Sequence, residues 1–270
     1  MRTGLRTSGV RGQVRERVYP SVIRAARGVF RALGLRITLV GVELVPVDGP
    51  VVLASNHVSF LDFLLVGLAG RRSERHVRFL ARHDVWSNPL ARPLMTAMRH
   101  VPVDREAPAA AYLRARSLLC QGEVVGIFPE AGVSTSFTVR ALMPGAVALA
   151  RETGAPLLPM AIWGSQRVLT AKRPVDLHRG RPVSLLVGPP VYVDPATDLR
   201  EGTARLGVRL QGMLDELQRL PVHQPAPGEH ALWHPAHLGG AAPHAAHART
   251  LESVPVSALT PSWLPGGVNG

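Results

Sequence analysis

The sequence has few of the residues that covalent or metal-based frameworks require. Cys120 is the only cysteine among 270 residues, which excludes intramolecular disulfides, cysteine-ligated zinc and iron–sulfur clusters. Aromatic residues make up 5%, so few side chains are present on which nucleic-acid bases can stack. Charged residues make up only 19% while hydrophobic residues reach 46%, which argues against global disorder. This composition and length predict one or two domains with a packed core.

Lysine is almost absent, because Lys172 is the only one and arginine supplies nearly all the positive charge. The formal net charge is +12, which indicates an anionic partner: nucleic acid, a phosphorylated substrate or an anionic membrane. Nine arginines and one acid, Glu16, fall within residues 1–36. The charge is therefore concentrated at the start of the chain.

The basic segment 1–36 contains no uninterrupted apolar run, so a cleavable signal peptide is not expected. Apolar residues alternate with its arginines at roughly helical spacing, interrupted by Pro20 and Gly28. This amphipathic pattern predicts a helix on an anionic membrane surface, and hence a peripheral protein on the cytoplasmic face of the cell membrane. The alternative is a disordered start followed by a helix that packs on the domain.

Residues 37–220 show the alternation of strands and helices that is typical of an α/β domain. Strands are expected over 37–42, 51–54, 101–103, 124–128, 157–162 and 183–187, and helices over 107–121, 144–153 and 201–220. The apolar stretch 51–70 contains Asn56, His57 and Asp62, which are costly at bilayer depth, so it predicts a strand and a core helix. The expected fold is a mixed, largely parallel sheet covered by helices.

Residues 221–270 differ in composition from the rest of the chain. They contain eight prolines, six glycines and six of the eleven histidines, with little periodicity. The histidine spacing matches no zinc pattern, so no metal site is expected there. We therefore predict an extended or disordered C-terminal tail.

The segment from Asn56 to Asp62 carries the clearest chemical signal. His57 closes a predicted buried strand, at the sheet edge where open α/β folds place their sites. If His57 lies in the turn and Asp62 in the first helical turn, the carboxylate can accept the imidazole Nδ1–H and leave Nε2 free as a base. Ser59 is a candidate helix cap in the same turn.

Three further segments lie at the ends of predicted strands: two follow a strand and one includes the start of a strand. Arg105 comes at the end of 101–103, where its guanidinium suits a phosphate, although an exposed pair with Asp104 is the alternative. Glu130 follows 124–128 and can bind a hydroxyl or orient a basic group, and Gly132 permits close approach of the backbone. Two prolines at positions 156 and 159 shape either an apolar wall or a structural turn.

In order and spacing, the four segments resemble the four motifs of the 1-acyl-sn-glycerol-3-phosphate acyltransferase family. The family's N-H-x4-D motif appears as Asn56-His57 and Asp62, its V-D-R motif ends at Arg105, and its F-P-E-G-T-R motif begins at 128. The resemblance covers roughly residues 37–190. It implies acyl transfer from acyl-CoA or acyl carrier protein to the hydroxyl of a lysophospholipid acceptor, with no metal, no other cofactor and no covalent acyl-enzyme.

The resemblance also assigns roles to individual residues. His57 would act as general base and Asp62 would orient it, while Asn56, Arg105, Glu130, Gly132 and Pro159 would bind the substrates, Pro159 on the acyl-donor side. One departure concerns the acceptor: Ala131-Gly132-Val133 stands where the family has Gly-Thr-Arg, so an expected phosphate-binding arginine is absent. Arg140 is a nearby candidate to replace it. The basic stretch 163–173 either meets the donor's phosphates or forms a solvated loop.

Two other classes of function remain as alternatives. A hydrolase would use His57 with a serine or with Cys120, but no G-x-S-x-G sequence is present and the adjacent leucines predict that Cys120 is buried. A non-catalytic basic protein would bind membranes or nucleic acid through residues 1–36. No helix-turn-helix, zinc-finger or aromatic RNA-binding signature is present, so nucleic acid is not an expected partner.

Overall fold

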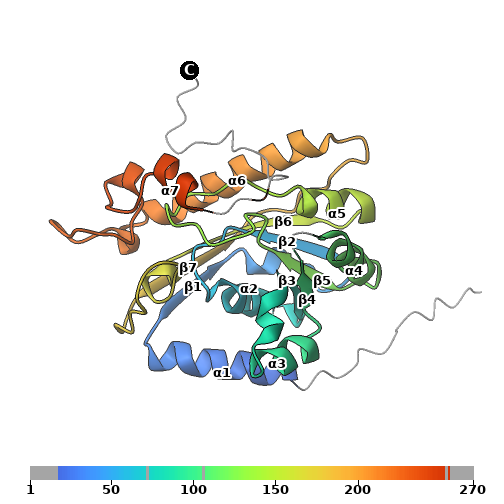
Figure 1. Ribbon diagram of the computed structural model, residues 1–270, viewed down its shortest axis with the longest axis horizontal. Coiled ribbons are helices and arrows are strands. Elements are labelled where there is room, and N and C mark those ends of the chain that lie inside the picture. Colours follow the sequence, from blue (N-terminus) through green and yellow to red (C-terminus); the bar gives the residue numbers. More distant parts are fainter. Residues whose placement is uncertain (1–17, 71–72, 105–106, 253–254, 256–270) are drawn as a thin grey trace, which may run out of the picture.

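The computed structural model describes residues 18–70, 73–104, 107–252 and 255. A seven-stranded sheet runs through them in the order β1-β7-β6-β2-β5-β3-β4 (Figure 1). Every neighbouring pair is parallel except β6 and β7, which are antiparallel. The prediction of a mixed, largely parallel sheet is confirmed. The strands are β1 (Arg36–Val40), β2 (Val51–Ser55), β3 (Val77–Arg82), β4 (Val101–Val103), β5 (Val124–Ile127), β6 (Leu157–Trp163) and β7 (Pro182–Val187).

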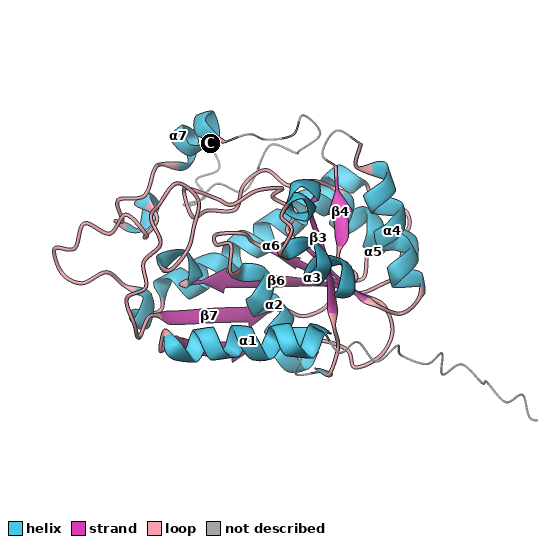
Figure 2. Ribbon diagram, turned by 60° about the horizontal axis from the view of Figure 1, so that its bottom comes forward, coloured by secondary structure: helices cyan, strands magenta, loops and turns pink. Residues whose placement is uncertain are grey.

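Helices cover both faces of the sheet, as the near-continuous apolar strands require. Two buried clusters fill the two faces: α4, α5 and α6 contribute to one, and α2 with the end of α1 to the other (Figures 1 and 2). In β2, Val52 and Ala54 point to the first cluster whereas Val51 and Leu53 point to the second. The helices are α1 (Val18–Ala32), α2 (Asp62–Gly70), α3 (Ala91–Ala97), α4 (Ala109–Cys120), α5 (Gly145–Thr153), α6 (Leu199–Arg219) and α7 (Ala245–Leu251).

The carboxyl ends of the parallel strands define one edge of the sheet. His57 follows β2, Glu130 follows β5, and the 3₁₀ turn Ser165–Arg167 follows β6. Because β7 is antiparallel to β6, Arg181 precedes β7 at this same edge. Residues from four separate parts of the chain therefore meet around the end of β2, where α/β folds bind ligands.

Strand β3 is absent from the strands expected from the sequence. The strand contains Arg78, which is 3% exposed. Its guanidinium donates to the Met98 carbonyl at 2.9 Å and forms an ion pair with Glu123 at 3.2 Å. A buried arginine breaks the apolar pattern that identifies central strands. Its partners are about 20 and 45 residues away, so a local pattern gives no sign of them.

Helix α1 packs on the domain rather than presenting its apolar face outward. Tyr19, Ile23 and Phe30 are 2–5% exposed, and the Tyr19 hydroxyl lies 3.2 Å from both the amide nitrogen and the carbonyl oxygen of Val77. The expected helix is therefore confirmed for residues 18–32, but in the packed form that was the alternative. The outward side carries Arg24, Arg27 and Arg31. Residues 1–17 of the basic segment lie outside the described residues.

The expectation of an extended or disordered tail is wrong for residues 221–252. Trp233 is 6% exposed and His223 and His234 are fully buried, while α7 ends this segment. The His234 ring contacts the rings of Trp163 and Trp233 edge to face, so the tail completes the apolar layer beside α6. Burial of these large rings offsets the flexibility that the prolines and glycines predicted. The remaining tail residues, apart from 255, lie outside the described residues.

Among the described ranges, none of the helices has the length and hydropathy needed to cross a bilayer. Cys120 ends α4 and is exposed, so the prediction of a buried thiol is wrong. The adjacent Leu118 and Leu119 fill the core instead.

Candidate active site

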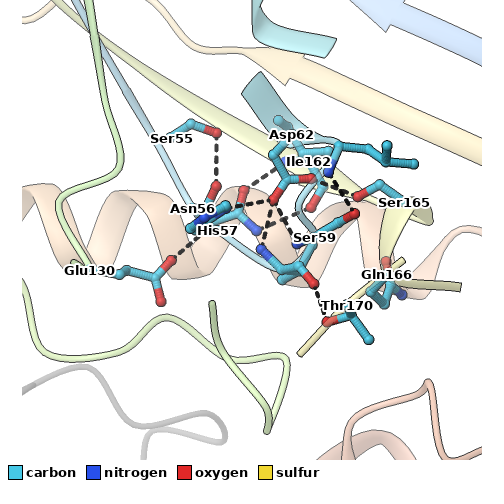
Figure 3. Close-up of polar contacts among 12 residues, drawn as sticks. Ser55, Asn56, His57, Ser59, Asp62, Glu130, Ile162, Ser165, Gln166 and Thr170 are labelled. Atoms are coloured by element: carbon cyan, nitrogen blue, oxygen red, sulfur yellow. Dashed lines mark hydrogen bonds and ion pairs between the residues drawn. The ribbon is translucent and has the colours of Figure 1, made fainter. Parts of the chain in front are cut away.

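Asn56 holds the end of β2 against β6. Its side-chain nitrogen donates to the Ile162 carbonyl at 3.0 Å, and its side-chain oxygen accepts from the Ile162 amide at 2.7 Å (Figure 3). The side chain is 1% exposed. Both of its hydrogen-bonding groups are thus used inside the protein, which places Asn56 as a support for His57 rather than at an open surface.

His57 lies in the turn between β2 and α2, with Asp62 at the first position of the helix. The imidazole Nδ1 is 3.0 Å from the Asp62 Oδ2, as the spacing of the two residues predicted (Figure 3). The carboxylate therefore accepts the Nδ1–H and fixes the tautomer in which Nε2 is the basic nitrogen. The ring stacks on Phe128, with centroids 4.2 Å apart, and the side chain is 17% exposed. His57 is therefore held in place yet partly open to the surface.

The Asp62 carboxylate is buried and fully hydrogen-bonded. Its Oδ2 also accepts from the amides of Val58 and Ser59, both at 2.8 Å, and its Oδ1 accepts from the Ser165 hydroxyl at 2.7 Å. Four donors therefore hold the Asp62 carboxylate in one orientation against the His57 imidazole.

A loop after β6 supports this turn from the other side. The Ser59 hydroxyl donates to the Leu169 carbonyl at 2.6 Å, and the Thr170 hydroxyl donates to the Val58 carbonyl at 2.7 Å (Figure 3). Ser59 also accepts from the Leu61 amide at 3.0 Å, within the turn that precedes the first residue of α2.

Glu130 connects His57 to the segment that follows β5. Its Oε1 accepts from the His57 amide at 2.7 Å and its Oε2 from the Arg140 amide at 2.8 Å. The side chain is 1% exposed. Burial raises the pKa of the Glu130 carboxyl to about 8, while the two backbone donors favour its charged form. Glu130 therefore fixes the backbone at His57 from the β5 side.

Gly132 leaves room for the guanidinium of Arg140. A Cβ at position 132 would lie 2.3 Å from the Arg140 Nη1, which no side chain allows without displacing the arginine. Arg140 in turn pairs with Glu252, with Nε and Oε2 2.7 Å apart and side chains 6% and 5% exposed. Glu252 also accepts from the Thr135 amide and hydroxyl, at 3.0 and 2.9 Å. Arg140 is thus near Gly132 as proposed from the sequence, and an acid from the tail neutralises it.

Pro159 is a predicted site residue that the structure does not bring to His57. Pro159 is buried inside β6 opposite Ala54, three residues before His57 along β2. Arg105 lies outside the described residues, and β4, which it follows, is at the far end of the sheet. The structure therefore gathers His57, Asp62, Asn56, Glu130 and Gly132, together with Arg140.

Sequence reasoning missed Ser165, Thr170 and Glu252. Ser165 and Thr170 lie 103 and 112 residues from their partners in the His57 turn. Only the expectation of a largely parallel sheet indicated that the segment after strand 157–162 would lie at this edge. Glu252 had no such signal because it belongs to the tail that was expected to be extended.

Residues 36–163 match the protein-family model described as Acyltransferase. A chloroplastic 1-acyl-sn-glycerol-3-phosphate acyltransferase of Arabidopsis thaliana is 27% identical over 161 residues, covering 58% of this chain and 44% of that protein. A 1-acyl-sn-glycerol-3-phosphate acyltransferase of Borreliella burgdorferi is 25% identical over 135 residues, covering 49% of this chain and 53% of that protein. The chain thus spans about half the length of these curated relatives.

The fold is also similar to a solved structure. The crystal structure of the 1-acyl-sn-glycerophosphate acyltransferase PlsC from Thermotoga maritima superposes with a TM-score of 0.64 at 21% identity, covering 74% of this chain and 80% of that one. The matched region of the family model contains His57, Asp62 and Glu130 and ends with β6. These findings agree with the resemblance seen in the four motifs: residues 36–163 match the Acyltransferase family model, and the fold is similar to that of a solved 1-acyl-sn-glycerophosphate acyltransferase.

Proposed function

We propose that the protein transfers a fatty acyl group from acyl-CoA or acyl carrier protein to the hydroxyl of a lysophospholipid such as 1-acyl-glycerol-3-phosphate, in phospholipid biosynthesis. The observation that carries this proposal is the 3.0 Å contact between the His57 Nδ1 and a buried, fully hydrogen-bonded Asp62. The names of the relatives support the choice of substrates. A hydrolase using Cys120 is disfavoured, since that thiol ends α4 and no contact joins it to His57.

In the proposed reaction, the His57 Nε2 accepts the proton of the acceptor hydroxyl as its oxygen attacks the thioester carbonyl carbon. The C–O bond forms as the C–S bond breaks, and the departing thiolate takes the proton from His57. The negative charge of Asp62 stabilises the imidazolium during transfer. The proposal needs no covalent acyl-enzyme and neither a metal nor another cofactor.

The other predicted residues receive roles according to where they lie. Asn56 and Glu130 are positioning residues. Asn56 hydrogen-bonds the Ile162 backbone on the adjacent strand, and Glu130 accepts from the backbone amide of His57. We assign the acceptor phosphate to Arg105 and to Arg140, because guanidinium groups bind phosphate oxygens in pairs. Gly132 shapes this side by admitting the Arg140 guanidinium, whereas Pro159 is buried inside β6 and receives no substrate contact.

We further propose that the protein binds the anionic cytoplasmic face of the cell membrane peripherally through α1. The apolar side of this helix is used inside the protein, so the attraction is electrostatic and comes from Arg24, Arg27 and Arg31. Membrane binding of this kind brings the enzyme to a lipid acceptor. No nucleic-acid partner is proposed.

An acyl-transfer assay with an acceptor panel tests the proposed function. The purified protein is supplied with acyl-CoA or acyl carrier protein and with 1-acyl-glycerol-3-phosphate, other lysophospholipids or glycerol-3-phosphate, and products are identified by mass. We expect acylation of 1-acyl-glycerol-3-phosphate. Acylation of another lipid alone would select the alternative, a family member with a different acceptor. Transfer to no acceptor from either donor would contradict the proposal.

A further inference from the structure

A pocket of about 370 Å³ lies at the same sheet edge as His57, beside the ends of β6 and β7. Its walls include Arg167 from the turn after β6, Arg173 and Arg181 from the loop before β7, and Trp233 from the tail. The volume falls in the range that small-molecule sites occupy. The position of Trp233 shows that the packed part of the tail completes the pocket.

The pocket carries an excess of positive charge. Three arginines face one acid, Asp176, which forms its ion pair with Arg181. No other carboxylate in the described part of the chain lies within ion-pair distance of Arg167 or Arg173. Arg167 and Arg173 therefore form no ion pair by direct contact with the described residues, although Asp176 is near enough to act on both and Glu229 on Arg167.

Each of the three guanidinium groups also has one buried nitrogen without a hydrogen-bond partner: Nε of Arg167, Nη1 of Arg173 and Nε of Arg181. Buried polar groups are normally paired, so such atoms indicate a missing partner. Burial is the main cause that lowers the pKa of Arg167 and of Arg173. The charge of Arg181 lowers both further, whereas Asp176 opposes the shift of both and Glu229 that of Arg167. A bound anion would supply acceptors for these nitrogens and relieve the repulsion.

The Arg167 guanidinium is held in one orientation. Its central carbon lies 3.8 Å from the centre of the Trp233 ring, a stacked arrangement that fixes the plane of the group. The Trp233 indole N–H donates to Glu229 at 2.7 Å, and its carbonyl accepts from Gln166 at 3.3 Å. A fixed planar guanidinium is suited to binding phosphate oxygens in pairs.

The pocket and the catalytic pair share one segment of chain. Ser165 hydrogen-bonds the Asp62 carboxylate, and the next two residues, Gln166 and Arg167, line the pocket. Along the sheet edge, the pocket lies on the β6 and β7 side of His57, whereas Glu130 and Arg140 lie on the β5 side. The arginine pocket and the segment that carries Glu130 and Arg140 thus flank His57 from opposite sides.

Resting on the acyl transfer proposed above, we propose that this arginine pocket binds the phosphate groups of coenzyme A as acyl donor. The acceptor phosphate then lies on the other side of His57, and the thioester and the hydroxyl meet at the imidazole. Three guanidinium groups suit a donor with several phosphates better than the single phosphodiester of an acyl carrier protein. The structure therefore favours acyl-CoA over the carrier protein.

Direct binding of coenzyme A tests the pocket without requiring catalysis. Isothermal titration compares the wild type with Arg173→Gln and Arg167→Gln, and with Arg209→Gln as the control, an exposed arginine of α6 outside the pocket. We expect coenzyme A to bind each pocket variant about tenfold more weakly, because one charge-assisted hydrogen bond is lost. Its affinity for the control variant should equal that for the wild type. Melting temperatures confirm folding. Absent binding to the wild type, or equal binding to all four proteins, would overturn the proposal.

A second comparison separates the source of the phosphate. In flotation with phosphatidylglycerol vesicles, the wild type and Arg173→Gln should bind equally. If Arg173→Gln floats less than the wild type but binds coenzyme A with the same affinity, the pocket binds lipid headgroups instead. In the transfer assay, Arg173→Gln should lower kcat/KM with acyl-CoA about tenfold but leave it unchanged with a phosphate-free acyl-N-acetylcysteamine thioester. If coenzyme A binds through Arg173 but no acyl group is transferred, the pocket stands and the proposed function fails.

Discussion

Replacement of Asp62 by asparagine removes one negative charge from the buried carboxylate and changes little else. The amide oxygen can take the place of Oδ2 and keep the three donors there: the His57 Nδ1–H and the amides of Val58 and Ser59. The amide nitrogen then faces the Ser165 hydroxyl, which can rotate to accept a hydrogen bond. Asp62→Asn is therefore expected to fold with its hydrogen bonds in place.

The size of each effect follows from these contacts. Four charge-assisted hydrogen bonds become neutral ones, each weaker by about 1 kcal/mol, so stability falls by a few kcal/mol at most. The effect on catalysis is larger, because the imidazolium loses the anion that stabilises it. A general base accelerates a reaction by a factor of about 10²–10⁴. We expect kcat to decrease by a factor in that range, with little change in KM.

The assay measures initial rates of acyl transfer at saturating substrate, with circular dichroism and thermal melting to confirm folding. Ser165→Ala is the matched control, since it removes only the donor to Oδ1 and should reduce kcat less than about tenfold. Asp62→Ala is not informative, because it leaves two buried amides unpaired. If folded Asp62→Asn keeps more than a tenth of the wild-type kcat, the electrostatic role assigned to Asp62 is refuted.

Three further predictions concern the surroundings of the site. Gly132→Ala should lower the free energy of unfolding by about 1–3 kcal/mol in denaturant titrations, because its Cβ would displace the Arg140 guanidinium; unchanged stability would contradict this packing. Burial and the charge of Arg78 lower the pKa of His100 to about 4. Between about pH 6.5 and pH 4 the unfolded chain therefore binds a proton at this histidine that the folded chain does not. The free energy of unfolding should decrease by up to about 3 kcal/mol as the pH falls through this range. His100→Asn, which retains an acceptor for the Phe79 amide, should show a shallower decline over this range, and an identical pH profile would refute the assignment. Replacing Arg24, Arg27 and Arg31 together by glutamine should weaken binding to anionic vesicles by about 1 kcal/mol per arginine, more at low salt than at high salt; equal binding by sedimentation would remove α1 from the membrane contact.

The sequence was sufficient for the parts of the molecule that depend on local spacing. The His57–Asp62 contact forms within one turn, so five residues of separation and the start of a helix were enough to predict it. The central strands β2, β5 and β6 are short apolar runs with clear boundaries, and the helices between them predicted a largely parallel sheet. A local pattern was therefore enough to predict both the fold class and the contact of His57 with Asp62.

Features that depend on distant contacts were missed or predicted wrongly. Arg78 makes β3 look like a surface segment until its buried partners are known. The tail packs because Trp233 and His234 fill a space beside Trp163 that no local pattern reveals. Its proline and glycine content concealed this packing, and with it the contact of Glu252 with Arg140.

The acyl-transfer rate of His57→Ala tests the central claim most directly. His83→Ala is the matched control, because His83 is an exposed histidine of the turn after β3. With acyl-CoA and an acceptor that the wild type acylates, we predict that folded His57→Ala loses at least about 10²-fold in kcat while His83→Ala keeps wild-type activity. Wild-type transfer by folded His57→Ala would contradict the assignment of His57 as the general base.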